Sequence, residues 1–301
     1  MSSGDKQPDY SRPIVFFGTE DFSLLALQAL VENKFKVAAV VTKPDSRKGR
    51  GKKLVAPTVK TYALDHGIPV WQPNKLPQIA EDIKALQPVT GVLVSYGKII
   101  PQNIIDLFTP GIINLHPSLL PQYRGPSPIE SAIANRDGVT GVSLMQLSAQ
   151  MDAGPVYAQL PYALDQKETK SELYDTLGQL GTHLLIDKLP SIIDGSLTAR
   201  PQDESKASYC QLLDKSNNLL DPEAITPGEA EARIRAHLGF PRSRIMLDDQ
   251  PVIVTKAHVV MGAESPLDVA FANGAYLRID ELINQHGKTV DAQSYLNGLK
   301  R

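Results

Sequence analysis

Three polar side chains in this sequence of 301 residues could act together on one reacting atom. Asn114 and His116 close the apolar run GIINLH, and two residues at this spacing on a strand point to the same face. An amide donor and an imidazole on one face could stabilise a developing oxyanion. Asp152, in the separate segment QMDAGPVY, could orient the imidazole and bias its protonation. Taken alone, Asn-x-His is more typical of a strand end whose polar side chains satisfy nearby backbone groups.

The segments around these residues predict a parallel sheet. The N-terminal stretch gives a strand at 13–17, an amphipathic helix at 21–31 and a second strand at 35–41, which is a βαβ unit. TGVLVSYG, a short helix at 101–108 and GIINLH repeat this pattern. We therefore expect a Rossmann-like α/β domain with its ligands beyond the carboxyl ends of the strands, where GIINLH ends. The first turn lacks the GxGxxG pattern of a dinucleotide site.

The second half of the chain changes in character. Two further strands precede a long amphipathic helix, at whose start Thr169 and Glu172 are spaced as a capping box. Residues 195–210 lose the helical period and are the expected linker. After them, one helix and several short strands with tight turns predict a small OB-like β-barrel. The predicted divisions are a loose tail over 1–12, a catalytic domain over 13–204 and a barrel-like domain over 205–301.

Composition restricts the class of protein. Hydrophobic residues make up 42% and charged residues 21%, which is ordinary for a soluble globular protein. No stretch reaches the roughly 18 apolar residues of a membrane span, and the polar start has no signal-peptide core. We therefore expect a cytoplasmic protein without a membrane partner. The single Cys210 excludes an intrachain disulfide and a Cys-rich zinc site, and a net charge of −2 argues against a generally basic coat for nucleic acid.

Longer motifs carry a resemblance to a known family. INLHPSLLPQYRGPSPIESAI, followed by GVSLMQLSAQMDAGPV, resembles the formyltransferases that use 10-formyltetrahydrofolate. FFGTEDFSLLALQAL, TKPDSRKGRGKKL, GFPRSR and NGAYLRIDEL resemble the branch of that family that formylates methionyl-tRNA. The resemblance implies transfer of a formyl group from 10-formyltetrahydrofolate, a co-substrate, to the amino group of methionyl initiator tRNA, for translation initiation. It implies no metal.

The resemblance also assigns site residues. It makes Asn114, His116 and Asp152 the catalytic groups. The loop SYGKIIP would offer backbone groups to the pterin, although a backbone contact leaves little trace in side-chain types. Leu119 and Leu120, in the segment that the resemblance assigns to the folate site, would fit an ordinary hydrophobic core equally well. The folate-site residues are Ser118, Leu119, Leu120, Pro121, Gly97 and Ile99.

A basic segment follows the second predicted strand. KPDSRKGRGKK has six cations against one acid, and its glycines and charges predict a mobile basic loop over 43–54. A solvated surface loop is the ordinary alternative. The resemblance assigns it contact with the acceptor arm of tRNA, which would make binding depend on salt. The assigned residues are Arg50, which we single out, with Arg47, Lys48, Lys52 and Lys53.

Two alternatives stay open. Pro117 after the histidine and the sequence GPSP depart from the commoner family pattern, which affects the assignment of the acceptor and leaves the formyl chemistry unchanged. One is a sugar-nucleotide or other small-amine N-formyltransferase with the same Asn/His/Asp site, whose activity would survive neutralisation of the basic loop. The other is a catalytically silent protein that binds folate or RNA without turnover. We also expect the protein to be a monomer.

Overall fold

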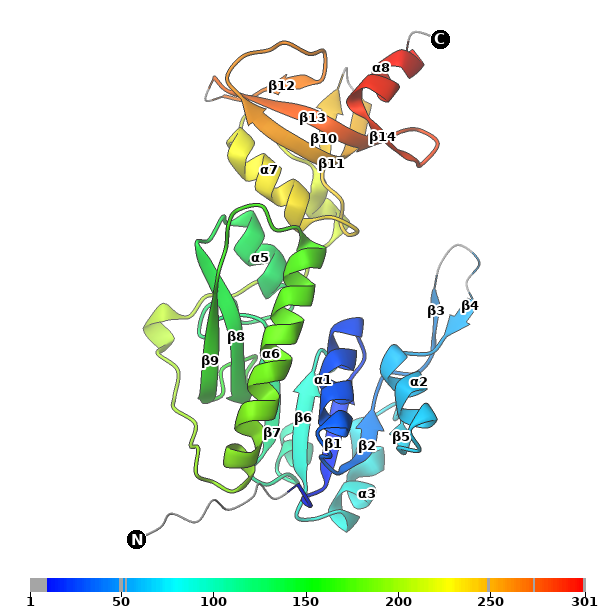
Figure 1. The fold of residues 1–301 in the computed structure, drawn as a ribbon, viewed down its shortest axis with the longest axis vertical. Helices are drawn as coiled ribbons and strands as arrows, with labels where there is room; N and C mark the ends of the chain where they lie inside the picture. The colour runs from blue at the N-terminus through cyan, green and yellow to red at the C-terminus, as the bar shows by residue number, and fades with distance from the viewer. Residues whose placement is uncertain (1–9, 49–50, 52, 248–249, 273, 300–301) are drawn as a thin grey trace. The chain divides into compact units, whose positions relative to one another are not determined.

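Two compact units make up the chain. The computed structural model describes residues 10–48, 51, 53–247, 250–272 and 274–299 (Figure 1). Each unit draws on more than one chain segment, so the expected domain boundary after residue 204 stays a prediction. The first unit comprises Met1–Arg124, Gly141–Pro161 and Asp175–Tyr209, and the second comprises Gly125–Thr140, Tyr162–Tyr174 and Cys210–Arg301.

A seven-stranded, mostly parallel sheet carries the strand with Asn114 and His116. Its order is β5-β2-β1-β6-β7-β8-β9. Pairing is parallel from β5 to β7, whereas β8 runs antiparallel to β7. The expected Rossmann-like α/β architecture is therefore confirmed, and β7 is the last parallel strand. The strands are β1 Ile14–Gly18, β2 Val37–Val41, β5 Val70–Trp71, β6 Thr90–Val94, β7 Ile112–His116, β8 Val139–Gln146 and β9 Val156–Ala163.

Apolar side chains bury this sheet on both faces. All five residues of β1 are buried, as the continuous apolar run of a central parallel strand predicts. The ring of Phe17 meets those of Tyr96 and Phe108 edge to face, with centroids 5.6 and 5.8 Å apart. Figure 1 shows α1 and α6 running alongside the strands. The helices that precede α7, Pro227–Ala236, in sequence, from both units, are α1 Asp21–Glu32, α2 Thr58–Asp65, α3 Ala80–Ala85, α4 Gln102–Ile105, α5 Pro128–Ala134 and α6 Lys170–Ile193, with 3-10 turns at Leu76–Ile79, Glu204–Lys206 and Lys215–Asn218.

Local signals in the sequence explain how α6 begins. The backbone N–H of Thr169 donates to the Glu172 carboxylate at 2.8 Å, and the Glu172 N–H approaches the Thr169 hydroxyl at 3.4 Å. The backbone N–H and the hydroxyl of Thr169, which both donate to the Glu172 carboxylate at 2.8 Å, lower its pKa. The predicted capping box is confirmed. The predicted helix over 101–108 is shorter in the structure, because α4 ends at Ile105.

The expected loose tail is described only over its last residues, 10–12. The Tyr10 ring packs edge to face on Phe35 with centroids 4.8 Å apart. The Arg12 guanidinium donates to the Thr109 carbonyl at 3.0 Å. These three residues are therefore tied to the first unit.

The basic segment forms a hairpin where the sequence predicted a loop over 43–54. Strands β3, Ser46–Lys48, and β4, Lys53–Val55, pair antiparallel. Asp45 anchors the start of β3, since its carboxylate lies 2.8 Å from the Lys60 ammonium and accepts from Gln72 at 2.9 Å. Hydrogen bonds from Gln72 and Lys60 lower the pKa of Asp45. Cross-strand backbone bonds at a fixed base therefore order the described strands β3 and β4 despite their charge.

The second unit contains an antiparallel sheet packed on a helix. The strand order is β10-β11-β13-β12, with β14 also paired to β13. Thr226 and Glu229 form a capping box at the start of α7. In the part of the chain that the structure describes, no helix is long and apolar enough to cross a membrane. The elements are α7 Pro227–Ala236, β10 Arg244–Leu247, β11 Gln250–Val260, β12 Asp268–Ala270, β13 Tyr276–Ile283, β14 Thr289–Asp291 and α8 Ala292–Leu299.

Candidate active site

Asn114 and His116 lie on one face of β7, and both residues are only 5% exposed. Leu115 between them points to the other face, where α6 packs closely. A Cβ placed on Gly181 of α6 would lie 2.6 Å from Leu115 Cδ1, so the helix approaches this face of the strand closely. This close approach of helix to strand fixes β7 and, with it, the direction of the two polar side chains.

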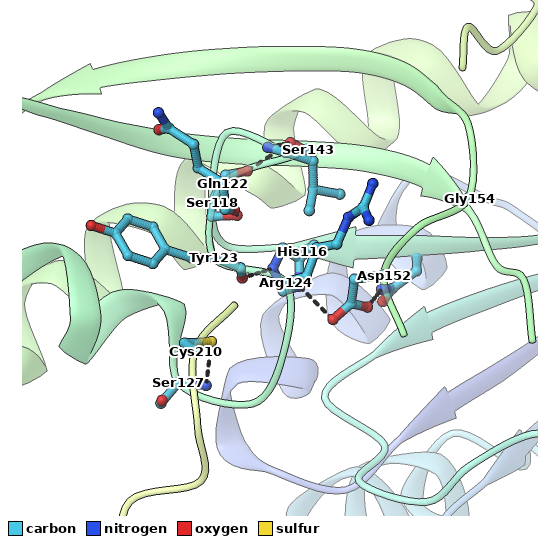
Figure 2. A network of polar contacts seen from close by, with 12 residues as sticks. His116, Ser118, Gln122, Tyr123, Arg124, Ser127, Ser143, Asp152, Gly154 and Cys210 are labelled. Carbon is cyan, nitrogen blue, oxygen red and sulfur yellow. Dashed lines mark hydrogen bonds and ion pairs between the residues drawn. The ribbon is translucent and has the colours of Figure 1, made fainter. Parts of the chain in front are cut away.

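Asp152 reaches the same place from the turn after β8 (Figure 2). Its Oδ1 lies 3.4 Å from Asn114 Nδ2, and its Oδ2 lies 3.8 Å from His116 Nδ1. Both distances exceed an ordinary hydrogen bond, so the three groups do not saturate one another. The structure thus brings the three sequence-predicted catalytic residues together, with their polar atoms facing a common space.

The imidazole is oriented by a backbone group that the sequence did not reveal. His116 Nε2 lies 2.9 Å from the carbonyl oxygen of Tyr123. Because a carbonyl only accepts, Nε2 carries the proton, and Nδ1 is the nitrogen that faces Asp152. The Tyr123 carbonyl thus holds one nitrogen of the ring, and the Asp152 carboxylate lies on the side of the other. The expected orienting role of Asp152 stays a prediction.

The expected folate segment is stiffened by internal hydrogen bonds. Ser118 is fully buried, and its hydroxyl donates to the Gln122 carbonyl at 2.6 Å (Figure 2). Ser143 of β8 donates to the Ser118 carbonyl at 2.6 Å and accepts from the Leu120 N–H at 3.1 Å. Leu120 is also buried, whereas Leu119 and Pro121 are half-buried. The Ser118 hydroxyl therefore shapes this segment from within, and the half-buried pair offers the accessible apolar surface.

The loop after β6 presents backbone groups at the carboxyl edge of the sheet. Ser95 and Gly97 both have positive φ, at +47° and +69°. Ile99 is 88% exposed. Within the described chain, the backbone groups of Gly97 and Ile99 take part in no hydrogen bond. Lys43 Cε would lie 3.1 Å from a Cβ on Gly97, so its ammonium covers this glycine. The backbone groups of Gly97 and Ile99 are therefore not used within the described chain, and the role predicted for them toward the pterin stays a prediction.

The basic hairpin is only partly described. Arg47 and Lys53 are exposed on β3 and β4. Arg50 and Lys52, two of the predicted tRNA contacts, lie outside the described residues, as does the side chain of Lys48. The described part therefore offers two exposed cations next to a strand end of the sheet.

Two side chains near the site escaped the sequence reasoning. Arg124 is 1% exposed although it is charged, and Gln202 of the expected linker donates to the Asp152 carbonyl at 2.7 Å. Arg124 stands in the motif YRG that carries the family resemblance, which is the signal that could have marked it. Gln202 had no such signal, because its surroundings are polar and aperiodic.

The sheet and the strand-end groups define an α/β protein built for acyl-type group transfer. The chain belongs to the formyl transferase family, whose sequence model matches residues 12–189. It is 38% identical over 299 residues to the methionyl-tRNA formyltransferase of Halorhodospira halophila, covering 95% of this chain and 96% of that protein. It is 35% identical to the methionyl-tRNA formyltransferase of Pelobacter propionicus, covering 96% and 93%. The resemblance seen in the sequence motifs is confirmed.

Solved structures share the fold at low identity. An N-formyltransferase from Helicobacter canadensis, solved with folinic acid and dTDP-3-aminofucose, superposes with a TM-score of 0.69 at 17% identity, over 89% of this chain and 98% of that one. HypX from Aquifex aeolicus, in complex with tetrahydrofolic acid, gives 0.65 at 15% identity, over 96% and 47%. Such identities support the fold alone.

Proposed function

We propose that the protein transfers the formyl group of 10-formyltetrahydrofolate to the free amino group of methionyl initiator tRNA, giving N-formylmethionyl-tRNA for translation initiation. The observation that carries the chemistry is the position of the Asp152 carboxylate, which lies 3.4 Å from Asn114 Nδ2 and 3.8 Å from His116 Nδ1. The choice of acceptor is supported by relatives named methionyl-tRNA formyltransferase, 34% to 41% identical to this chain.

Each catalytic group has one task in this proposal. The amine attacks the formyl carbon, and the tetrahedral oxyanion accepts a hydrogen bond from Asn114 Nδ2. A donor of this kind is worth about 3 to 4 kcal/mol in related acyl transfers. His116 takes the amine proton at Nδ1, since its Nε2–H is held by a backbone carbonyl. Asp152 stabilises the resulting imidazolium. The C–N bond to the folate then breaks, and the departing folate nitrogen receives a proton.

The folate is proposed to lie between two segments of the first unit. One is the loop after β6, where Gly97 and Ile99 supply backbone edges to the pterin. The other is Ser118–Pro121, whose Leu119 and Pro121 provide half-buried apolar surface. This arrangement would present the formyl carbon to β7, because β6 and β7 are neighbours in the sheet.

The tRNA is proposed to bind through the basic hairpin and the C-terminal domain. The hairpin residues are those assigned from the sequence, including Arg50 and Lys52. We propose that 205–301 is an OB-like barrel, which its short antiparallel strands support, and that 13–204 is the catalytic domain. We further propose that the protein acts as a cytoplasmic monomer without a membrane partner.

A sugar-nucleotide N-formyltransferase is the second candidate, because structures of that kind share the fold. Purified protein given 10-formyltetrahydrofolate should be assayed with charged initiator tRNA and, separately, with amino-sugar nucleotides. We expect formylation of the tRNA with kcat/KM at least a hundredfold above that for any amino sugar. Preference for an amino sugar would overturn the assignment of the acceptor, and no turnover with any amine would overturn the assignment as an enzyme.

A further inference from the structure

The segment expected to be a linker places the half-buried amide of Gln202 against the turn of Asp152. Gln202 Nε2 donates to the carbonyl oxygens of Asp152 and Gly154, both at 2.7 Å. Asp152 has φ +47°, a left-handed conformation that few residues other than glycine adopt. A strained residue persists only when its surroundings determine it. The two bonds from Gln202 provide that constraint on either side of the turn.

Arg124 holds the same amide from behind. Its Nε and Nη2 donate to Gln202 Oε1 at 3.1 and 2.9 Å. The Gln202 amide thus meets two donors at its oxygen and two acceptors at its nitrogen, so a flipped amide would face like groups on both sides. The orientation of Gln202 is therefore fixed by its contacts.

A carboxylate fixes the guanidinium in turn. Glu204 accepts from Arg124 Nη1 at 2.9 Å and from Nη2 at 2.7 Å, and this bidentate pair raises the pKa of Arg124. The Tyr209 hydroxyl accepts from Nη1 at 3.1 Å. Since Arg124 is almost fully buried, loss of these partners would leave a buried charge unpaired. The guanidinium is a rigid support for Gln202.

The same segments also reach the other side of the imidazole. The N–H of Tyr123 donates to the Ser208 hydroxyl at 2.9 Å, and the N–H of Arg124 donates to the Ser208 carbonyl at 2.9 Å. The Tyr123 carbonyl accepts the hydrogen bond from His116 Nε2, as Figure 2 shows. Residues 202–209 therefore support both the group facing Nε2 and the turn whose carboxylate faces Nδ1.

We propose that Gln202, held by Arg124, is a positioning residue that sets the Asp152 carboxylate opposite His116 Nδ1 for formyl transfer. This inference rests on the proposed function. Gln202 touches neither substrate nor the reacting atoms, and it acts on the reaction through Asp152. Displacement of a catalytic group by about 1 Å can cost on the order of a hundredfold in rate.

The test is Gln202→Glu in the full chain. This change keeps an oxygen for Arg124 and replaces the nitrogen that binds the two carbonyls, so it should repel the Asp152 turn while preserving the pairing of the guanidinium. We expect kcat to fall roughly 10- to 100-fold, with KM for folate and tRNA changed less than about threefold. A matched control is Gln87→Glu. Gln87 lies before the amino end of β6, and its side-chain amide donates to the Leu107 carbonyl at 3.0 Å. This control should leave kcat unchanged.

A double-mutant cycle separates positioning from general structural damage. If Gln202 acts through Asp152, Gln202→Glu should have less than about a twofold effect on kcat in an Asp152→Ala background. Equal effects in both backgrounds would overturn the proposal, as would unchanged kcat in the single variant. The cycle is run with whichever amine wild-type protein formylates best. Wild-type protein inactive with every amine would instead count against the proposed function.

Discussion

Replacement of Asn114 by Ala gives the sharpest test of the proposed chemistry. The variant removes one amide donor from β7 and leaves His116 and Asp152 in place. Loss of one oxyanion donor lowers kcat by about 100- to 1000-fold, or roughly 2.7 to 4 kcal/mol in the activation free energy. Because the oxyanion forms only during the reaction, KM for the folate should change little. Formation of N-formylmethionyl-tRNA from labelled formylfolate measures both constants.

The structure predicts a small effect of the same change on folding. The Asn114 amide approaches Asp152 at 3.4 Å, a long contact, so the free energy of unfolding should fall by only about 1 to 2 kcal/mol. Thr90→Val is a matched control, because Thr90 is buried in neighbouring β6 and its hydroxyl donates to the Thr109 carbonyl at 2.8 Å. It should lower stability similarly with normal turnover. A rate within threefold of wild type for Asn114→Ala, or an equal loss of rate in the control, would refute the reasoning.

Three further predictions concern other parts of the chain. Neutralising Arg47 and Lys53 together to Gln should raise KM for tRNA severalfold and flatten its dependence on salt, while KM for folate stays constant. Gly97→Ala should raise KM for folate about tenfold or more, because the added methyl group meets the Lys43 side chain and φ there is +69°; an unchanged folate KM would contradict the loop assignment. Burial lowers the pKa of His237 to about 4, below the ordinary value of 6.5. The unfolded chain therefore binds the proton more readily, and stability should fall by up to about 3 kcal/mol from pH 6.5 to 4. Thermal unfolding should show this fall in wild type and a smaller one in His237→Gln.

The sequence predicted the strand that carries the site because the relevant signal is local. A buried apolar run ending in Asn114 and His116 defines both the strand and the shared face of the two side chains. Asp152 lies far along the chain, and only the family motif linked it to them. The Tyr123 carbonyl could not be predicted, since any residue supplies a carbonyl. Gln202 could not be predicted either, because an aperiodic polar segment looks the same whether it is solvated or folded back onto the site.

The basic segment shows a different limit of sequence reasoning. Its lysines, arginines and glycines have low strand preference, so charge and composition predicted a loop. In the described part of the segment, the start of the hairpin is held by contacts with residues outside it, where Asp45 meets Lys60 and Gln72. Pairing at the base of the hairpin depends on residues more than ten positions away in sequence, which composition does not report.

The hydrogen bond between His116 and the Tyr123 carbonyl limits how the imidazole can transfer a proton. A ring whose Nε2 proton is held by a carbonyl cannot pass a proton from one side of the imidazole to the other. In the proposed reaction, Nδ1 must both collect the proton from the attacking amine and give it up again on the same side. Nδ1 is then the only ring nitrogen that exchanges a proton during the proposed reaction. Turnover therefore depends on the leaving nitrogen or a water molecule reaching Nδ1 from the side on which the amine delivered its proton.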